Sequence, residues 1–164
     1  MAKRITIVQG HPDPAGDRFC HALASAYPNG ARQAGREVRT LDVARRDVPV
    51  MRTKEDFEHG QISDTVRECQ QAIAWAQLRV FIYPLWLGTM PAALKGLLEQ
   101  IFRPGFAVAE VGSGKVWKKL LKGRSARIVV TMGMPAFAYR WYFRARSLKS
   151  LERNVLGFVG IGPI

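Results

Sequence analysis

The sequence predicts an α/β protein in which a parallel sheet is covered by helices on both faces. Short apolar runs alternate with amphipathic helical segments along the whole chain, and most of the runs are nearly continuous in apolar residues. Such strands are typical of a parallel sheet that is buried on both sides. Right-handed crossovers then favour a doubly wound, five-stranded sheet with the strand order 2-1-3-4-5. A chain of 164 residues suits one core, so we expect a single domain over residues 1–164.

Apolar periodicity and turn residues place the elements of this fold along the chain. In order, the sequence predicts strands over residues 4–8, 37–43, 78–83, 126–131 and 158–164, helices over 18–34, 62–76, 91–102 and 139–155, and a hairpin within 106–124. We expect Asp17 to cap the first helix and Pro28 to kink or interrupt it, because proline cannot donate a helical hydrogen bond. The chain stops directly after the fifth strand, so a final helix is missing from the predicted fold. We expect either a truncated chain or a dimer partner that shields the exposed face.

Composition excludes several classes of protein. The chain is 48% apolar, which excludes a disordered protein, and no stretch approaches the roughly 18 apolar residues of a membrane span. Its two cysteines, Cys20 and Cys69, lie far apart, without a CxxC motif and without histidines at metal-site spacing. This pattern predicts reduced thiols, no metal site and a cytoplasmic protein without a targeting segment.

The charge of the chain is strongly positive. Its 25 Lys and Arg residues against 13 Asp and Glu residues give a formal net charge of +12, which attracts polyanions and anionic small molecules. No nucleic-acid-binding motif is present, and aromatic residues are interleaved with basic ones only within residues 139–153. We therefore expect no specific nucleic-acid partner, and we attribute part of the charge to the binding of phosphate-bearing cofactors.

The segment from Tyr83 to Phe102 is the most informative part of the chain, because it joins an apolar strand to an apolar-faced helix through an apolar turn. Within this turn, residues 85–89 include one tryptophan and two leucines, which have little reason to face solvent uncovered. Backbone amides of strand-to-helix turns are common ligand contacts at the carboxyl edge of a parallel sheet. The segment therefore indicates a binding site for a flat cofactor, and the alternative is a loop buried under a neighbouring subunit.

Three loops are expected to meet at that edge of the sheet. The loop from His11 to Cys20 offers the free amides of a helix N-terminus, with Arg18 beside them, to an anionic group such as phosphate. The turn after Tyr83 offers a flat apolar surface, and a third loop follows Thr131. The chain contains neither GxGxxG nor GxxxxGKS/T, so neither the dinucleotide fingerprint nor the nucleotide-triphosphate loop applies. A phosphate cradle next to a flat apolar slot predicts a flavin mononucleotide site, with the predicted hairpin as an insertion beside it.

Several motifs give the chain a family resemblance. They are the His11 loop with residues 19–23 after it, the segment 84–96, residues 104–107, residues 121–123 and residues 131–133. Together they resemble the flavodoxin-like NAD(P)H:quinone oxidoreductase family over essentially the whole chain, and the segment 84–95 is the most specific of them. The resemblance implies a flavodoxin-like fold, bound FMN or FAD, and a homodimer with the flavin near the subunit interface. It also implies NAD(P)H as co-substrate and the two-electron reduction of quinones, azo compounds or related acceptors.

The resemblance also implies roles for individual positions. The cofactor-binding positions are His11, Arg18, Phe19 and Cys20 for the flavin phosphate, Pro84, Leu85, Trp86, Leu87 and Gly88 for the isoalloxazine ring, and Thr131 and Gly133 in the third loop. Tyr139 matches a tyrosine that lies over the flavin and helps to place the acceptor. About seven residues further on, where the family often carries a histidine, this chain has arginine at position 146, so a tyrosine–histidine proton relay is not expected. Arg146 is instead a candidate for stabilising negative charge on the reduced flavin or for binding a cofactor phosphate, since arginine is no proton donor at neutral pH.

These features predict a ping-pong reaction. NAD(P)H passes a hydride to the flavin and leaves, and a quinone-like acceptor then takes its place. We expect FMN rather than FAD, because the short chain has no evident extension for binding an adenosine. Two other functions stay open: a regulatory flavoprotein subunit of a potassium-efflux-type transporter, and an azo, nitro or FMN reductase. A one-electron carrier of the flavodoxin type fits less well, because such carriers are typically acidic.

The candidate positions also have purely structural interpretations. His11 could close its loop through a backbone hydrogen bond, Cys20 could serve only in packing, and Trp86 could anchor an interface. The aromatic residues at positions 141–143 suit the core, an interface or the wall of an acceptor pocket. The basic residues between positions 140 and 153 suit a solvated helix face as well as the selection of NADPH.

Overall fold

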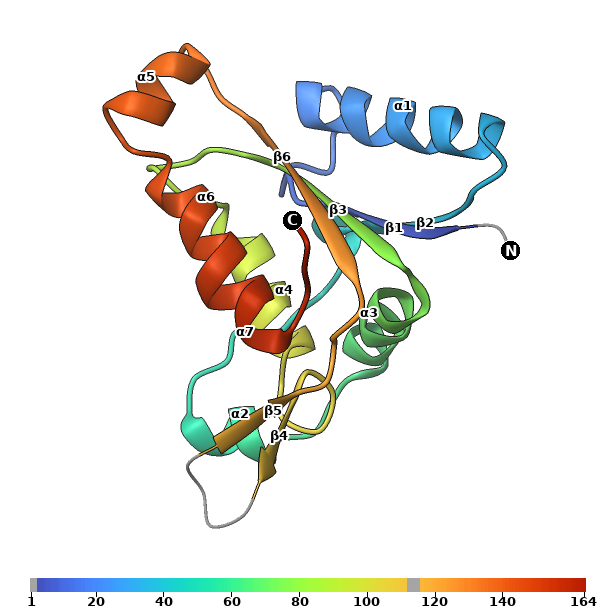
Figure 1. Cartoon of the computed structure of the whole chain (residues 1–164), viewed down its shortest axis with the longest axis vertical. Helices are drawn as coiled ribbons and strands as arrows, with labels where there is room; N and C mark the ends of the chain where they lie inside the picture. Colours follow the sequence, from blue (N-terminus) through green and yellow to red (C-terminus); the bar gives the residue numbers. More distant parts are fainter. Residues whose placement is uncertain (1–2, 112–115) are drawn as a thin grey trace.

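The structure is a computed structural model that describes residues 3–111 and 116–164, and its centre is a four-stranded parallel sheet between two layers of helices (Figure 1). The strands are β1 (Arg4–Gln9), β2 (Glu37–Asp42), β3 (Leu78–Pro84) and β6 (Ser125–Thr131), with an antiparallel hairpin of β4 (Val108–Val111) and β5 (Val116–Lys119). The helices are α1 (Phe19–Gln33), η1 (Val43–Arg45), α2 (Lys54–Glu58), α3 (Asp64–Trp75), α4 (Ala92–Ile101), α5 (Ala136–Trp141), α6 (Arg146–Ser150), η2 (Leu151–Leu156) and α7 (Gly157–Val159).

The strand order is β2-β1-β3-β6, which agrees with the first four positions of the predicted order. Ile7 of β1 lies opposite Thr40 of β2 and Val80 of β3, and Val80 lies opposite Arg127 of β6. All three pairings are parallel. The carboxyl ends of β1, β3 and β6 therefore lie at one edge of the sheet.

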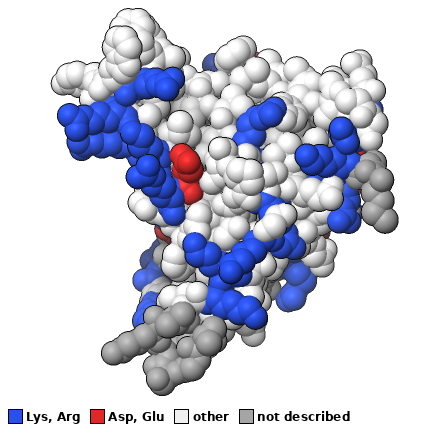
Figure 2. Space-filling view, viewed as in Figure 1, with Lys and Arg blue, Asp and Glu red and all other residues white. Residues whose placement is uncertain are grey.

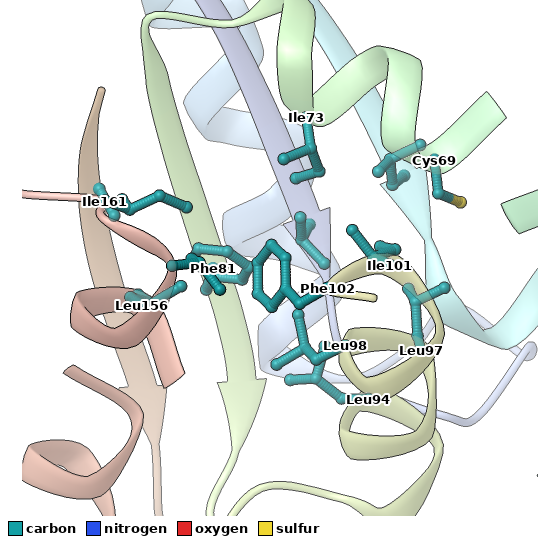
Figure 3. Packing of buried hydrophobic residues seen from close by; sticks show 14 of the residues in the cluster. Cys69, Ile73, Phe81, Leu94, Leu97, Leu98, Ile101, Phe102, Leu156 and Ile161 are labelled. Atoms are coloured by element: carbon teal, nitrogen blue, oxygen red, sulfur yellow. The ribbon is translucent and has the colours of Figure 1, made fainter. Parts of the chain in front are cut away.

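Side chains of the central strands alternate between two cores, one on each face of the sheet. On one face, Ile5, Ile7, Val80 and Ile82 pack against Cys20 and Ala24 of α1. On the other face, Val8 and Phe81 belong to a larger core with residues of α3, α4, η2 and α7. Figure 3 shows Phe81 close to Leu156, Ile161 and Phe102. Burial on both faces accounts for the nearly continuous apolar strands.

The predicted strand over residues 158–164 is wrong, and with it the five-stranded sheet. Residue 158 lies in α7, which ends at Gly160 with a φ of 97°, a left-handed conformation that suits glycine. The residues after it form no strand, although the Gly162 amide donates to the Arg124 carbonyl over 2.7 Å beside the start of β6. An apolar run does not by itself distinguish a helix from a strand, and this one continues the buried side of η2.

The predicted helix over residues 139–155 is two helical segments. It divides at Arg144 and Ala145, whose φ angles of 54° and 48° lie in the left-handed region. The helix α5 also begins at Ala136, within the predicted loop, whereas α6, η2 and α7 follow one another without a break. Two consecutive non-glycine residues in this conformation give no signal in the sequence, so the division was not predictable.

The first helix differs from its prediction at its N-cap, and Pro28 does not interrupt it. Its N-cap is Arg18 rather than Asp17, and the Arg18 amide donates to Nδ1 of His21 over 3.3 Å. The helix continues through Pro28 to Gln33. Pro28 is buried on the inner side of the helix, so packing against the sheet offsets the hydrogen bond that it cannot make.

The hairpin prediction is confirmed for the strands, which pair from Val108 opposite Lys119 to Val111 opposite Val116, whereas its turn lies outside the described residues. The hairpin does not lie beside the candidate site: Figure 1 places it at the opposite end of the molecule from α5 and the N-terminus of α1. Near it, Arg103 is only 3% exposed and donates to four backbone carbonyls of the segment 56–61.

The surface is basic, as the composition predicts. Figure 2 shows several clusters of Lys and Arg on one face, including the region of α5 and α6, with few acidic residues between them. Within the described part of the chain, no helix combines the length and the apolar character that crossing a membrane requires.

Candidate functional site at the carboxyl edge of the sheet

The first loop, which follows β1, is held tightly against β3. The Gly10 amide donates to the Ile82 carbonyl over 2.7 Å. A Cβ atom at position 10 would lie 2.7 Å from Cδ2 of Leu94 and 2.9 Å from Cβ of Tyr83, so only glycine permits this approach. The course of the loop toward α1 is therefore fixed by packing.

The second loop, which follows β3, is a tight turn with an exposed tip. Trp86 and Thr89 exchange two backbone hydrogen bonds of 2.8 and 3.0 Å, and between them Leu87 and Gly88 have φ angles of 46° and 81°. The Leu87 side chain is fully exposed, and a Cβ atom at position 88 would meet nothing within 4 Å. The Leu85 amide, at the base of the turn, donates to the Thr131 carbonyl over 2.8 Å. This tie fixes the turn to the end of β6 while its tip stays open.

Two histidines and a tryptophan link the first and second loops. The His11 ring is buried and lies 5.1 Å from the His21 ring and 5.5 Å, edge on, from the Trp86 indole. The Asp13 amide donates to Nδ1 of His11 over 3.1 Å. His11 therefore closes its loop through a backbone hydrogen bond, as its purely structural interpretation expects. Burial, and secondly the neighbouring His21, lower the pKa of His11 below its usual 6.5. The neutral form is therefore favoured in the folded protein.

His21 holds a buried donor without an acceptor. Because Nδ1 of His21 accepts the Arg18 amide, the proton of the neutral ring is on Nε2. This Nε2 atom is buried, and no described group accepts a hydrogen bond from it. An unpaired buried donor is costly. Its position in the first turn of α1 suits an incoming acceptor, such as an oxygen of an anionic ligand.

Arg18 forms ion pairs with two carboxylates. Its guanidinium lies 3.0 Å from a carboxylate oxygen of Asp13 and 3.1 Å from one of Asp17. The Ala15 amide, and secondly Arg18, lower the pKa of Asp13. Phe19, the next residue, is 68% exposed. The backbone amides of α1, rather than a free arginine charge, are therefore the main attraction that this loop offers to an anion.

Cys20 connects α1 to the end of β6. Its Sγ lies 2.9 Å from Oγ1 of Thr131, and its side chain is buried. Burial raises the pKa of the Cys20 thiol, so the group stays protonated and does not act as a nucleophile near neutral pH. Gly133, two residues beyond Thr131, is exposed, and a Cβ atom there would meet nothing within 4 Å.

A cavity of about 180 Å³ joins the second loop to the segment after β6. Its lining residues are Leu85, Gly88, Met134, Tyr139, Phe143, Arg146 and Ser147. Tyr139 is 6% exposed, and its Oη lies 2.6 Å from Oγ of Ser147 and accepts the Leu148 amide over 3.2 Å. An aromatic wall, a cation and a hydroxyl pair thus face one small space.

The structure brings most of the predicted site residues together. His11 meets Trp86, Cys20 meets Thr131, and Pro84, the last residue of β3, lies opposite Thr131 in the sheet. Four predicted residues are exceptions. The side chains of Phe19 and Leu87 and the Cβ position of Gly133 face solvent. Arg18 is paired with neighbouring carboxylates.

Sequence reasoning did not assign three contributors to the site, which are His21, Met134 and Ser147, and it left Phe143 open between the core, an interface and a pocket wall, whereas the structure places Phe143 in the cavity lining. His21 had a signal, because a polar side chain three residues after an N-cap is the pattern of a capping box. Ser147 reaches the cavity only through the turn between α5 and α6, whereas Met134 lines it from the segment between β6 and α5. Across residues 3–111 and 116–164, no group of three His, Cys, Asp or Glu residues is placed to hold a metal ion.

A protein-family model described as the flavodoxin-like fold matches residues 3–164. The chain belongs to this flavodoxin-like family. The order of its parallel strands and the position of its three loops are those that a doubly wound sheet of this kind requires.

Curated relatives of this flavodoxin-like protein carry the names of oxidoreductases. A ribosyldihydronicotinamide dehydrogenase-like protein from Penicillium crustosum is 25% identical over 93% of the chain, and the chain covers 64% of that protein's length. An uncharacterized NAD(P)H oxidoreductase from Haemophilus influenzae is 26% identical over 86% of the chain and 78% of its own length. The chain thus spans slightly less than two thirds of the first relative and about four fifths of the second.

Solved structures share the fold over nearly all of this flavodoxin-like chain. An NAD(P)H:quinone oxidoreductase from Methanothermobacter marburgensis matches with a TM-score of 0.76 and 21% identity, over 99% of this chain and 85% of its own. An FMN-dependent NADH-azoreductase from Bacillus anthracis, in complex with FMN, matches with a TM-score of 0.71 and 18% identity, over 97% and 83% of the two chains. At these identities the likeness concerns the fold.

Proposed function

We propose that the chain is a flavin-dependent NAD(P)H oxidoreductase that reduces quinone-like acceptors by two electrons. The observation that carries this proposal is the cavity of about 180 Å³ that joins Leu85 and Gly88 to Tyr139 and Arg146. Positions expected to hold a flavin ring and positions expected to place an acceptor line one space. The names of the relatives, as NAD(P)H oxidoreductases and a quinone oxidoreductase, support the same reaction.

The residues present fit FMN as the cofactor. The unpaired Nε2 of His21 suits a phosphate group, since it is a buried donor that lacks an acceptor, and the positive end of the α1 dipole adds to this attraction. The open turn at Leu87 and Gly88 suits a flat ring, because no side chain occupies the space beside it. When bound, the flavin supplies the two-electron hydride chemistry that no side chain can perform. The FMN-dependent azoreductase of the same fold supports FMN over FAD.

Arg146 and Tyr139 are the proposed catalytic residues. Arg146 lines the cavity with a fixed positive charge, which stabilises negative charge that develops on bound groups during hydride transfer. Tyr139 is buried and lines the same space, and we assign its hydroxyl the role of hydrogen-bond donor to a quinone carbonyl oxygen. Buried thiols such as Cys20 take no part in this chemistry.

We also propose a cytoplasmic homodimer. Three large, strongly exposed aromatic residues lie on α5 or directly after it, namely Phe137, Trp141 and Tyr142. A patch of this kind marks an interaction surface, and it lies next to the cavity through Phe143. A second copy over this patch would shield the site from water, and sedimentation of the purified protein at several concentrations tests it.

The absorption spectrum tests the proposed function directly. Purified protein is incubated with FMN, desalted and examined anaerobically during addition of NADPH or NADH and then of 1,4-benzoquinone. We expect retained yellow colour that bleaches with the nicotinamide and returns with the quinone. Protein that retains no flavin contradicts the proposal, and protein that retains flavin without bleaching favours a regulatory or carrier role.

A further inference from the structure

The turn between α5 and α6 is a strained connection at the wall of the cavity. Arg144 and Ala145 both have left-handed φ angles, which non-glycine residues adopt only at an energetic cost. Two backbone bonds hold the turn: the Ala145 amide donates to the Tyr139 carbonyl over 3.1 Å, and the Arg146 amide donates to the Phe143 carbonyl over 3.3 Å. Strain that the surrounding structure maintains in this way is concentrated at functional sites.

This turn places a backbone amide and a serine hydroxyl within hydrogen-bond distance of the hydroxyl oxygen of Tyr139. The Leu148 amide donates to Oη over 3.2 Å, so one lone pair of the phenol is already used. Oγ of Ser147 lies 2.6 Å from the same oxygen. If the serine hydroxyl donates, Oη accepts two hydrogen bonds, and its own proton is left free to point into the cavity that Tyr139 and Ser147 both line.

We infer that Ser147 is a positioning residue that makes Tyr139 the proton donor to the acceptor. Ser147 orients the phenol hydroxyl toward the bound quinone, and with the Leu148 amide it stabilises the oxygen after the proton has left. This inference rests on the proposed function and deepens it. It also supplies a proton path that does not require a histidine at position 146, where the chain has arginine.

The step balances for a two-electron reduction. The quinone receives a hydride that originates from the nicotinamide, and its carbonyl oxygen receives a proton from Tyr139. The Oη–H bond breaks, an O–H bond forms on the acceptor, and the phenolate keeps the electron pair. The Ser147 hydroxyl and the Leu148 amide both donate to this anionic oxygen, as preorganised donors do in oxyanion holes, until water returns the proton.

A purely structural role explains only one of the two contacts. The N-cap of α6 is Ala145, which has no side-chain acceptor, and the Tyr139 oxygen therefore accepts the amide of Leu148 in the first turn. Capping of this kind needs the phenol but not the serine hydroxyl. Substitution of Ser147 therefore distinguishes a purely structural role of the Tyr139–Ser147 pair from a role in proton transfer.

The experiment compares four variants of the flavin-loaded protein: Ser147→Ala, Ser147→Thr, Tyr139→Phe and the double variant. Each is assayed with 1,4-benzoquinone, which takes a proton, and with ferricyanide, which takes electrons alone. For Ser147→Ala we expect the ratio of the quinone kcat to the ferricyanide kcat to fall about tenfold, because one donor to an anionic oxygen is lost. We expect Ser147→Thr to keep this ratio within about twofold of the parent value. Tyr139→Phe and the double variant should lower the ratio by the same factor. The matched control is Ser150→Ala, an exposed serine of α6 outside the cavity.

A second measurement uses the protein without its cofactor. Hydrogen exchange of the Leu148 amide reports whether the phenol is held in place, and we expect exchange to be several-fold faster in Ser147→Ala and in Tyr139→Phe but unchanged in Ser150→Ala. A quinone-to-ferricyanide ratio that is unchanged in Ser147→Ala, or losses that add in the double variant, would overturn the inference. Leu148 exchange unaffected by Ser147→Ala would also overturn it. If the parent protein oxidises no NAD(P)H with either acceptor, the proposed function fails instead, and the exchange data still decide whether Ser147 positions Tyr139.

Discussion

The two edges of the sheet are built in opposite ways. At the edge where β3 begins, Arg79 is fully buried and donates to the carbonyls of Ile73 and Gln77. Beyond the end of α4, Arg103 similarly satisfies four carbonyls. At the carboxyl edge, by contrast, lie all three described non-glycine residues with left-handed φ angles, together with the unpaired Nε2 of His21. At one edge, two buried arginines donate to backbone carbonyls and support the fold, whereas the other edge keeps strained residues and one unpaired donor at the candidate site.

The supporting edge should be the more sensitive one for stability. Replacing Arg103 with methionine removes the donors of four backbone carbonyls in a buried place, so we expect the free energy of unfolding to fall by about 3 kcal/mol or more in urea denaturation. The matched control is Arg67→Met, on the exposed side of α3, which should change stability by less than about 0.5 kcal/mol. Equal effects of the two substitutions would show that the hydrogen bonds of Arg103 do not support this edge.

The open turn at the site should be the more sensitive region for ligand binding. Gly88 and Gly35 both have a left-handed φ and free space around a Cβ atom, so Gly88→Glu and Gly35→Glu introduce the same strain and the same charge. We expect Gly88→Glu to weaken FMN binding about 100-fold or more, because the side chain occupies the proposed ring site, while Gly35→Glu binds FMN like the parent. Flavin fluorescence titration measures both. Normal binding by Gly88→Glu would remove this turn from the site.

Strain at the carboxyl edge should also be measurable as stability. Ala145→Gly allows the left-handed φ of 48° without steric conflict, so we expect the free energy of unfolding to rise by about 0.5–1 kcal/mol. Because the looser turn holds Ser147 less firmly, turnover with quinone should fall at the same time. A gain in stability without any change in turnover would mean that the strained turn has no part in the reaction. The control is Ala74→Gly on α3, where glycine should destabilise the helix by about 1 kcal/mol.

The smallest expected effect concerns pH. Because the pKa of His11 is lowered, the folded protein binds this proton less readily than the unfolded chain, whose histidine titrates near 6.5. Unfolding therefore takes up a proton at acid pH, and stability should fall as the pH drops below about 6.5. His11→Gln should flatten this decline between pH 7 and 5, whereas His59→Gln, on the surface, should leave it as in the parent. Thermal unfolding of the parent and of both variants, measured between pH 7 and 5, tests this expectation.

The sequence predicted those elements whose signals are local. Strands over 4–8, 78–83 and 126–131 were predictable because buried parallel strands are short, continuous apolar runs. The turn at 85–89 was predictable as a site because its apolar residues stand between a strand and a helix. Cys20 and Thr131, 111 residues apart, were both assigned to the site because strand ends of a parallel sheet meet at one edge.

The remaining features depended on tertiary contacts. The apolar run at 158–164 reads equally as a strand, and only its packing against the core of α4 and η2 makes its start helical. Pro28 stays within α1 because the sheet buries it.

The sequence by itself thus determined the class of the fold, the edge at which the site lies and most of its backbone-defined positions, because these depend on periodicity and on strand order. The tertiary structure alone decided that His21 has a buried, unpaired donor, that Arg18 is neutralised by two carboxylates, and that Ser147 meets Tyr139. Each of these features depends on where a turn or a loop places a side chain. Arg144 and Ala145 show the difficulty, because they have left-handed φ angles although neither is a glycine.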